Sequence, residues 1–292
     1  MNWYIPAKTF LLGEYAAVAG AGAIVLCTTP CFELSLSSDG GLSGIHPESP
    51  AGRWWARQEN REGLLWRDPY AGMGGLGASS AQFLGAYLAS CYLSGEEPQQ
   101  AAMLSAYYES AWTGQGLRPS AYDVLAQSQQ QCVYINREKN QIKEYAWPFP
   151  DLSFLLLHSG QKLATHQHLQ TATLPTIPIL STIVEQAKEA FDRADSEQLI
   201  SCITNWQNEL SATGFMADHS IRLINELKSN PAILAAKGCG ALGADVLLLL
   251  IPTSELDKQT KILAANGCTI LANNKTLHQG DSLIIKKTHE KT

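Results

Sequence analysis

The sequence carries little charge and has no surplus of basic residues. Charged residues make up 16% of its 292 positions, and 27 acidic against 21 basic residues give a formal net charge of −6. A general nucleic-acid-binding protein needs clustered Lys and Arg to neutralise phosphates, so we expect no nucleic-acid partner. Hydrophobic residues make up 45%. This excludes a disordered chain and favours a compact α/β protein, in which two domains are expected more than one large one.

Long hydrophobic runs and paired cysteines are also missing. Lys8 and Glu14 interrupt the apolar N-terminal stretch, and residues 15–27 are too few and too rich in glycine to span a bilayer. The seven cysteines include no CxxC pair, so we expect no zinc site and interpret them as reduced thiols in the core. These features predict a soluble, cytoplasmic protein that does not associate with membranes.

The strongest local signal is the glycine-rich segment 73–81, which reads MGGLGASSA. Apolar residues recur after it at helical spacing and predict a helix with one buried stripe, made of Phe83, Leu84, Tyr87, Leu88, Cys91 and Tyr92. Glycines let the backbone approach an anion, and the first NH groups of a helix have no partner within the helix. The segment therefore predicts a phosphate-binding loop, with a glycine turn that only packs a strand on a helix as the alternative.

Neither common nucleotide motif fits this loop. It lacks the lysine of a Walker loop, and Asp123 lies too far away to be the acidic partner of a dinucleotide fingerprint. Segment 51–67 holds Trp54, Trp55 and Trp66. We interpret it as an ordinary amphipathic segment, with a surface that stacks on bases as the alternative.

The remaining pattern predicts two α/β halves that meet at Phe149-Pro150-Asp151, which gives domains 1–150 and 151–292. In the first half we expect strands at 3–5, 9–12, 23–27, 32–36 and 132–135 and a helix at 99–112. In the second we expect strands at 154–157, 246–251 and 268–271 and helices at 179–193, 196–213 and 217–228.

Three segments come together as a family resemblance: residues 6–15 (PAKTFLLGEY), 74–81 (GGLGASSA) and 237–245 (KGCGALGAD). In order and spacing they resemble the three motifs of the GHMP kinases, the superfamily of galactokinase, homoserine kinase, mevalonate kinase and phosphomevalonate kinase. The resemblance spans almost the whole chain. It implies a two-domain kinase, monomeric or homodimeric, with an N-terminal domain like ribosomal protein S5, a ferredoxin-like C-terminal domain, ATP and Mg²⁺ as cofactors and a small-molecule acceptor.

The resemblance also implies roles for individual residues. Lys8 and Asp123, the latter in segment 119–124 (PSAYDV), become the catalytic pair. The loop that holds the ATP phosphates comprises Gly74, Gly75, Leu76, Gly77, Ala78, Ser79 and Ser80. The acceptor-binding set comprises Lys8, Glu14, Tyr15, Arg118, Ser120, Lys237, Gly240 and Ala241. The magnesium ligands are Ser79 and Glu109, with Ser80 in place of Ser79 if the loop carries one inserted residue.

The sequence around Glu14-Tyr15 and Tyr122-Asp123 resembles phosphomevalonate kinases more than mevalonate kinases, and so does segment 157–165. The leading hypothesis is phosphorylation of 5-phosphomevalonate. Mevalonate or another small alcohol is the alternative acceptor, and a nucleotide-binding pseudoenzyme is the third hypothesis. Lys162, His166 and His168 are further candidate cations for an anionic acceptor. The chain departs from the family pattern where Ala7, Ala121 and Leu242 replace glycines, which bears on the fit of the acceptor more than on the fold.

Overall fold

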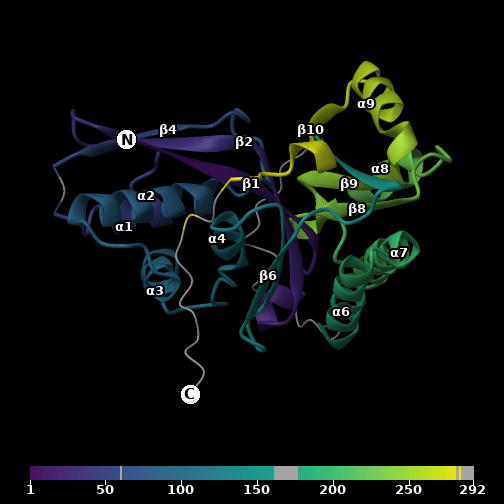
Figure 1. Ribbon diagram of the computed structural model, residues 1–292, viewed down its shortest axis with the longest axis horizontal. Coiled ribbons are helices and arrows are strands. Elements are labelled where there is room, and N and C mark those ends of the chain that lie inside the picture. Colours follow the sequence, from purple (N-terminus) through teal and green to yellow (C-terminus); the bar gives the residue numbers. More distant parts are fainter. Residues whose placement is uncertain (60, 161–176, 281–282, 284–292) are drawn as a thin grey trace.

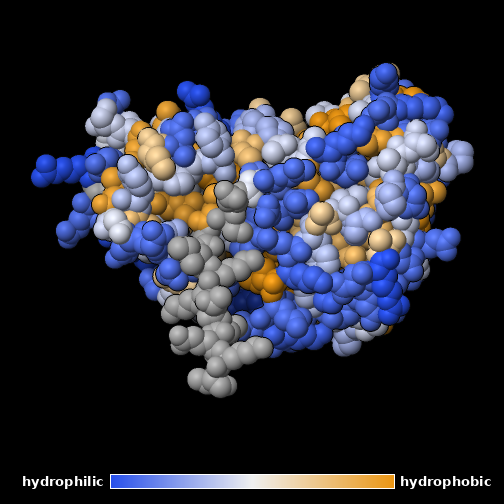
Figure 2. Space-filling view, viewed as in Figure 1, coloured by the Kyte–Doolittle hydropathy of each residue, from blue (hydrophilic) through white to orange (hydrophobic). Residues whose placement is uncertain are grey.

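The computed structural model describes residues 1–59, 61–160, 177–280 and 283. It contains two β-sheets with helices packed on each, arranged as the two lobes visible in Figure 1. This confirms the predicted mixture of helix and sheet in two halves. Hydrophilic residues predominate on the face drawn in Figure 2, and hydrophobic residues show mainly in its recesses.

The first sheet has six strands. Five run in the order β3–β4–β2–β5–β6, and β1 pairs with β2. Their bounds are β1 Asn2–Leu12, β2 Ala23–Ser37, β3 Leu42–Ser43, β4 Gly63–Arg67, β5 Cys132–Asn136 and β6 Gln141–Tyr145. The two short strands predicted in each of β1 and β2 are single strands, because their polar residues still pair in one continuous antiparallel ladder with local register shifts.

Two helices of this half cover the sheet at β1 and β2: α2 (Ala78–Ser94) and α4 (Tyr122–Gln127). The other elements are η1 (Ala16–Ala19), α1 (Pro50–Trp55) and α3 (Gln100–Ala111). α2 is buried on more sides than one stripe, since Gly85 lies against Leu34 and Ile5 of the sheet while α1 packs on another face. The prediction that Tyr92 belongs to the buried stripe is wrong. Its position near the C-terminal end of α2 leaves it 56% exposed.

The second sheet has the antiparallel order β10–β7–β9–β8. Its strands are β7 Leu152–His158, β8 Ala235–Cys239, β9 Val246–Pro252 and β10 Thr269–Asn273. Its helices are α6 Ile177–Arg193, α7 Ser196–Ala212, α8 Asp218–Leu227 and α9 Leu256–Ala265, with short turns η2 Ala241–Gly243, η3 Thr253–Glu255 and η4 Asn274–Thr276. The predicted α6, α7, α8, β9 and β10 agree closely with the observed elements. β8 and α9 were not predicted.

The chain passes from the last strand of the first sheet, which ends at Tyr145, to the first strand of the second sheet, which begins at Leu152. The domain boundary at 150/151 stays a prediction. After η4 the chain returns to the first sheet, where Leu277 bridges to Thr28. All seven cysteines lie in the described part and are free thiols, five of them buried. Among the described helices, none combines the length and the apolar character that crossing a membrane requires.

The three tryptophans of segment 51–67 take part in packing. Trp55 and Trp66 are buried, and Trp66 stacks on Phe32 of β2. Trp54 donates a hydrogen bond to the hydroxyl of Ser90 on α2. These contacts favour the ordinary amphipathic interpretation of the segment over a surface that stacks on bases.

Candidate active site

Lys8 lies in the middle of β1, with its side chain largely buried beneath the glycine-rich loop. Its backbone NH donates to the carbonyl of Leu76 at 2.9 Å, which ties the loop to the strand. Its Nζ lies 3.1 Å from Oδ2 of Asp123 and 4.9 Å from the ring centre of Phe10. The structure therefore brings together the two residues predicted to be catalytic, although β1 and α4 are far apart in sequence.

The glycines of the loop are required by both backbone conformation and space. Gly77 has φ +79°, and a Cβ there would lie 2.6 Å from Cγ of Lys8. Gly75 has φ +80°, and a Cβ there would lie 2.7 Å from Cβ of Asp245, just before β9. Side chains in these positions would be strained and would push the loop away from its neighbours. The loop is thus packed between Lys8 and the third motif, directly before α2.

The two serines of the loop have different surroundings. Ser80 is buried, and its hydroxyl donates to Oε1 of Gln127 at 2.6 Å and contacts the carbonyl of Gly77 at 3.0 Å. Ser79 is exposed at the first turn of α2. The amide of Gln127 also donates to the carbonyl of Pro6 at 2.9 Å. Ser80 therefore belongs to a buried network, whereas the Ser79 hydroxyl faces solvent at the helix N-terminus.

Sequence reasoning missed Gln127. It follows Asp123 by four residues on α4, so both side chains lie on the same face of that helix. That spacing was the available signal. Through its bonds to the loop and to β1, Gln127 fixes α4 against the strand that carries Lys8.

Asp123 lies in the first turn of α4, where the positive end of the helix dipole stabilises its charge. The helix begins after Ala121, which has φ +63°. A left-handed conformation at a residue other than glycine is strained, as it also is at Leu242 with φ +53°. Both positions replace glycines of the resembling family, and both keep the backbone conformation that glycine adopts freely. The side chain of Asp123 is 35% exposed, against 11% for Lys8.

Glu14, Tyr15 and Lys237 form a buried connection between the two sheets. Nζ of Lys237 is fully buried, pairs with Oε1 of Glu14 and donates to the carbonyl of Phe10 at 3.3 Å. Burial alone would lower the pKa of Lys237, but Cys239 and Glu14 beside it raise its pKa above the ordinary value. Lys237 is therefore a buried cation held by Glu14.

Tyr15 is also buried, and its hydroxyl accepts from the NH of Leu242 at 3.2 Å. Burial raises its pKa to about 12, so the hydroxyl stays protonated at neutral pH. The predicted acceptor contacts by Tyr15 and Lys237 have no support in these positions. Both side chains are enclosed, and their visible role is to join the first motif to the third.

The third motif curves beside the glycine-rich loop. Gly240 has φ +85°, with Oδ2 of Asp245 within 3.1 Å of where its Cβ would lie. Ala241 opens the short η2 turn. Since Asp245 also lies against Gly75, this motif lines the loop at Gly75, whereas Lys8 lies against Gly77. Sequence reasoning quoted Asp245 as part of the motif but did not assign it this place.

The other predicted residues lie around the segment that leads into α4. Ser120 is half-buried, and its hydroxyl accepts from the NH of Tyr122 at 3.3 Å. Arg118 is exposed, with its guanidinium 3.5 Å from the ring centre of Tyr108. Glu109 lies on an exposed face of α3 and pairs with Arg57 at 3.8 Å. The structure thus gives no support to Glu109 as a magnesium ligand, because no contact in the described part of the chain joins it to Asp123 or Ser79. Lys162, His166 and His168 lie outside the described residues.

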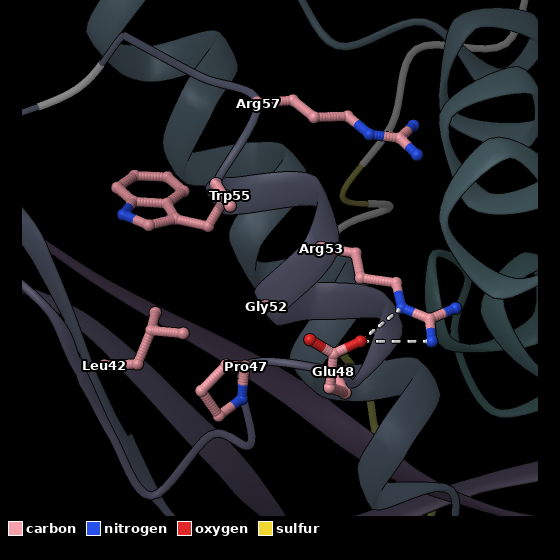
Figure 3. Close-up of a pocket in the computed structure, with 8 residues that line it drawn as sticks. Leu42, Pro47, Glu48, Gly52, Arg53, Trp55 and Arg57 are labelled. Carbon is pink, nitrogen blue, oxygen red and sulfur yellow. Dashed lines mark hydrogen bonds and ion pairs between the residues drawn. The ribbon is translucent and has the colours of Figure 1, made fainter.

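Two hollows were found away from this centre. One, of about 420 Å³, lies beside α1 and is shown in Figure 3, where Arg53 is held by Glu48 and Arg57 extends away from Trp55. The other, of about 640 Å³, lies at the start of β7 between Asp151 and α7. Lys8, Asp123 and the glycine-rich loop line neither of these two hollows.

No family model and no curated protein matches this sequence. Solved structures do match its fold. Methanococcus jannaschii mevalonate kinase is 15% identical, with 94% of this chain and 97% of that chain covered and a TM-score of 0.73. Streptococcus pneumoniae phosphomevalonate kinase in complex with phosphomevalonate and AMPPNP is 16% identical, with coverage of 94% and 99% and a TM-score of 0.73. Lactococcus lactis galactokinase complexed with galactose is 10% identical, with coverage of 96% and 94% and a TM-score of 0.73.

These similarities extend over nearly the full length of each chain and therefore include both sheets. At sequence identities of 10–16%, these similarities establish the fold and do not identify a substrate. Together with the two sheets and the order of the three motifs, they show that this chain has the two-domain fold of the GHMP kinases.

Proposed function

We propose that this protein is a kinase that transfers the terminal phosphoryl group of ATP to a small-molecule acceptor at Lys8 and Asp123. One observation carries the proposal: Nζ of Lys8 lies 3.1 Å from Oδ2 of Asp123, directly beneath a glycine-rich loop at the N-terminus of α2. A cation at that point stabilises charge on the group in transfer, and the carboxylate orients or deprotonates the acceptor.

The loop residues fit the phosphates of a nucleoside triphosphate. Gly75 and Gly77 have no room for a Cβ and leave the backbone open, and the NH groups of the first turn of α2 have no partner within the helix. The exposed hydroxyl of Ser79 and the carboxylate of Asp123 are oxygen ligands of the kind Mg²⁺ prefers. When bound, Mg-ATP supplies the phosphoryl group and neutralises part of its charge.

The acceptor decides how much Asp123 must do. An alcohol has to lose a proton held with a pKa far above 7, so it needs the carboxylate as a base or a strong orienter. A phosphomonoester, with a second pKa of about 6, is already mostly a dianion at neutral pH and mainly needs cations that bind its charge. We propose 5-phosphomevalonate as the acceptor, because the sequence segments around Tyr15 and Tyr122 resemble those of phosphomevalonate kinases. Mevalonate or another small alcohol is the alternative.

The first test measures ADP release by the purified protein with 5-phosphomevalonate, mevalonate, homoserine and galactose in parallel. We expect turnover with 5-phosphomevalonate. If another acceptor is used instead, the kinase proposal stands and the named acceptor is wrong. If ATP binds but none of the acceptors is phosphorylated, the enzyme proposals fail, and a nucleotide-binding pseudoenzyme remains.

Replacement of Asp123 by Asn tests the chemistry. The variant keeps the shape of the side chain and removes its charge, so turnover with an alcohol should fall by about 10²–10⁴-fold, with a smaller loss for a phosphate acceptor. Single-turnover rates measured with saturating ATP separate this step from binding. Unchanged rates with both kinds of acceptor would remove Asp123 from the mechanism.

A further inference from the structure

Two arginines contact the same tyrosine ring near the start of α4. Cζ of Arg118 lies 3.5 Å from the ring centre of Tyr108, and Cζ of Arg137 lies 5.5 Å from it. Arg137 also donates to the hydroxyl of Tyr108 and, at 3.1 Å, to the carbonyl of Ser120. Three separate elements, the end of α3, the loop before α4 and the β5–β6 turn, thus bring two guanidinium groups to the same ring. We call Arg118 and Arg137 the arginine pair.

Neither member of the arginine pair forms an ion pair with a carboxylate in the described part of the chain. By contrast, Arg53, Arg57 and Arg67 each face a glutamate. Two positive charges held beside one ring repel each other, and an anion bound to both would relieve that repulsion. The guanidinium fork matches the oxygens of carboxylates and phosphates, and stacking on Tyr108 holds Arg118 in place for such a ligand.

The arginine pair lies beside the segment that leads into α4, the helix that carries Asp123. Ser120, which Arg137 contacts, precedes Asp123 by three residues. The backbone NH of Arg137 donates to the hydroxyl of Tyr122 at 3.0 Å and to the carbonyl of Gly20 at 3.1 Å. Gly20 closes the η1 turn that follows the first motif. In Figure 1, the start of α4 and the hairpin that contains β6 lie side by side below β1.

We propose that Arg118 and Arg137 bind an anionic group of the acceptor, a carboxylate or a phosphate, that is distinct from the atom receiving the phosphoryl group. This inference rests on the proposed kinase function and narrows its substrate class to acidic acceptors, against neutral sugars. It also adds Arg137, which sequence reasoning did not single out, to the residues that determine specificity.

The test compares Arg118→Met and Arg137→Met with Arg67→Met, a matched arginine that is 71% exposed on β4. Steady-state KM values are measured for ATP and for the acceptors 5-phosphomevalonate and mevalonate. Loss of one charge-assisted contact should raise the acceptor KM by about 10- to 100-fold. The KM for ATP should change less than about twofold, and Arg67→Met should resemble the wild type. Arg137→Lys retains the charge and is the control for a structural effect of Arg137→Met on the loop. It should recover part of the lost affinity for the acceptor.

Several outcomes would overturn the inference. An unchanged acceptor KM in both variants removes the arginine pair from acceptor binding, and a raised KM for ATP alone assigns it to the nucleotide. If the wild-type protein turns over no acceptor, the proposed function fails separately, and calorimetry of mevalonate and of inorganic phosphate with the wild type and Arg118→Met decides the inference. Weaker binding of either anion by the variant then supports an anion site and shows which group it takes. Equal binding, or no binding by the wild type, refutes the site.

Discussion

The buried pair of Glu14 and Lys237 makes the sharpest prediction about stability. The side chain of Lys237 is 0% exposed and that of Glu14 is 9% exposed, and Oε2 of Glu14 has no hydrogen-bond partner among the described residues. Lys237→Met keeps an unbranched chain but leaves the carboxylate buried without its counter-charge. Breaking a buried pair in this way costs about 3–5 kcal/mol of unfolding free energy, a large part of the total for a typical domain, about 5–15 kcal/mol.

The double variant Glu14→Gln/Lys237→Met supplies the matched comparison. It buries no charge, so we expect it to be more stable than Lys237→Met, with a coupling free energy of about 2 kcal/mol or more. Urea unfolding followed by tryptophan fluorescence and by circular dichroism gives the free energies and tests whether the transition is two-state. Lys258→Met, which breaks an exposed pair with Glu255, should leave the unfolding free energy close to that of the wild type.

The reasoning is refuted if Lys237→Met loses less than about 1 kcal/mol, below the range for a broken buried pair. It is also refuted if the effects of the two single substitutions simply add up in the double variant. Either result would mean that the pair does not stabilise the contact between the two sheets.

Three further predictions concern the loop and the outer ion pairs. Ser79→Ala should lower turnover with little effect on stability, whereas Ser80→Ala should cost about 1–3 kcal/mol of stability by leaving its buried amide partner unsatisfied; the reverse pattern would exchange their roles. Gly77→Ala should destabilise the protein by about 1–2 kcal/mol from its positive φ alone and lower the rate by displacing Lys8, as urea unfolding and kinetics would show. Partial burial alone would raise the pKa of Asp192, but hydrogen bonds from neighbouring lysines and a tyrosine hold it well below the ordinary value. Because the pKa is depressed in the folded state, Asp192→Asn should cost up to about 1 kcal/mol at pH 7, and this difference should shrink progressively as the pH falls below about 4 toward the depressed pKa; a difference that stays constant over that range would contradict it.

Local pattern predicted most of the elements because the apolar spacing of a segment reports the face that it buries. α6, α7, α8 and β9 are long or strongly apolar, and their bounds were close to those observed. β8 was missed because its sequence, AAKGC, contains a lysine and a glycine that look like a turn. Only the partner Glu14, 223 residues earlier, lets Lys237 occupy a buried strand.

The candidate site divides in the same way. The glycines at 75 and 77 were predicted from the sequence because they are a local requirement of backbone conformation. Lys8 and Asp123 were predicted through the resemblance of their segments to the GHMP kinases. The choice between Ser79 and Ser80 was open, because it depends on Gln127 reaching across from α4. Glu109 was assigned to the magnesium site through the family resemblance, but its position on α3 directs it to Arg57.

By itself, then, the sequence determined the two-lobed α/β organisation, the loop that begins α2 and the identity of the catalytic candidates. The organisation and the loop follow from hydrophobic spacing and from the special conformations of glycine, which act over a few residues, whereas the catalytic candidates follow from the resemblance to the GHMP kinases. Only the tertiary structure decided which charges meet. The pairing of Lys8 with Asp123, the burial of Lys237 against Glu14 and the convergence of Arg118 and Arg137 on Tyr108 each join segments distant in the chain. Such contacts depend on how strands and helices pack, and short-range pattern carries no record of that packing.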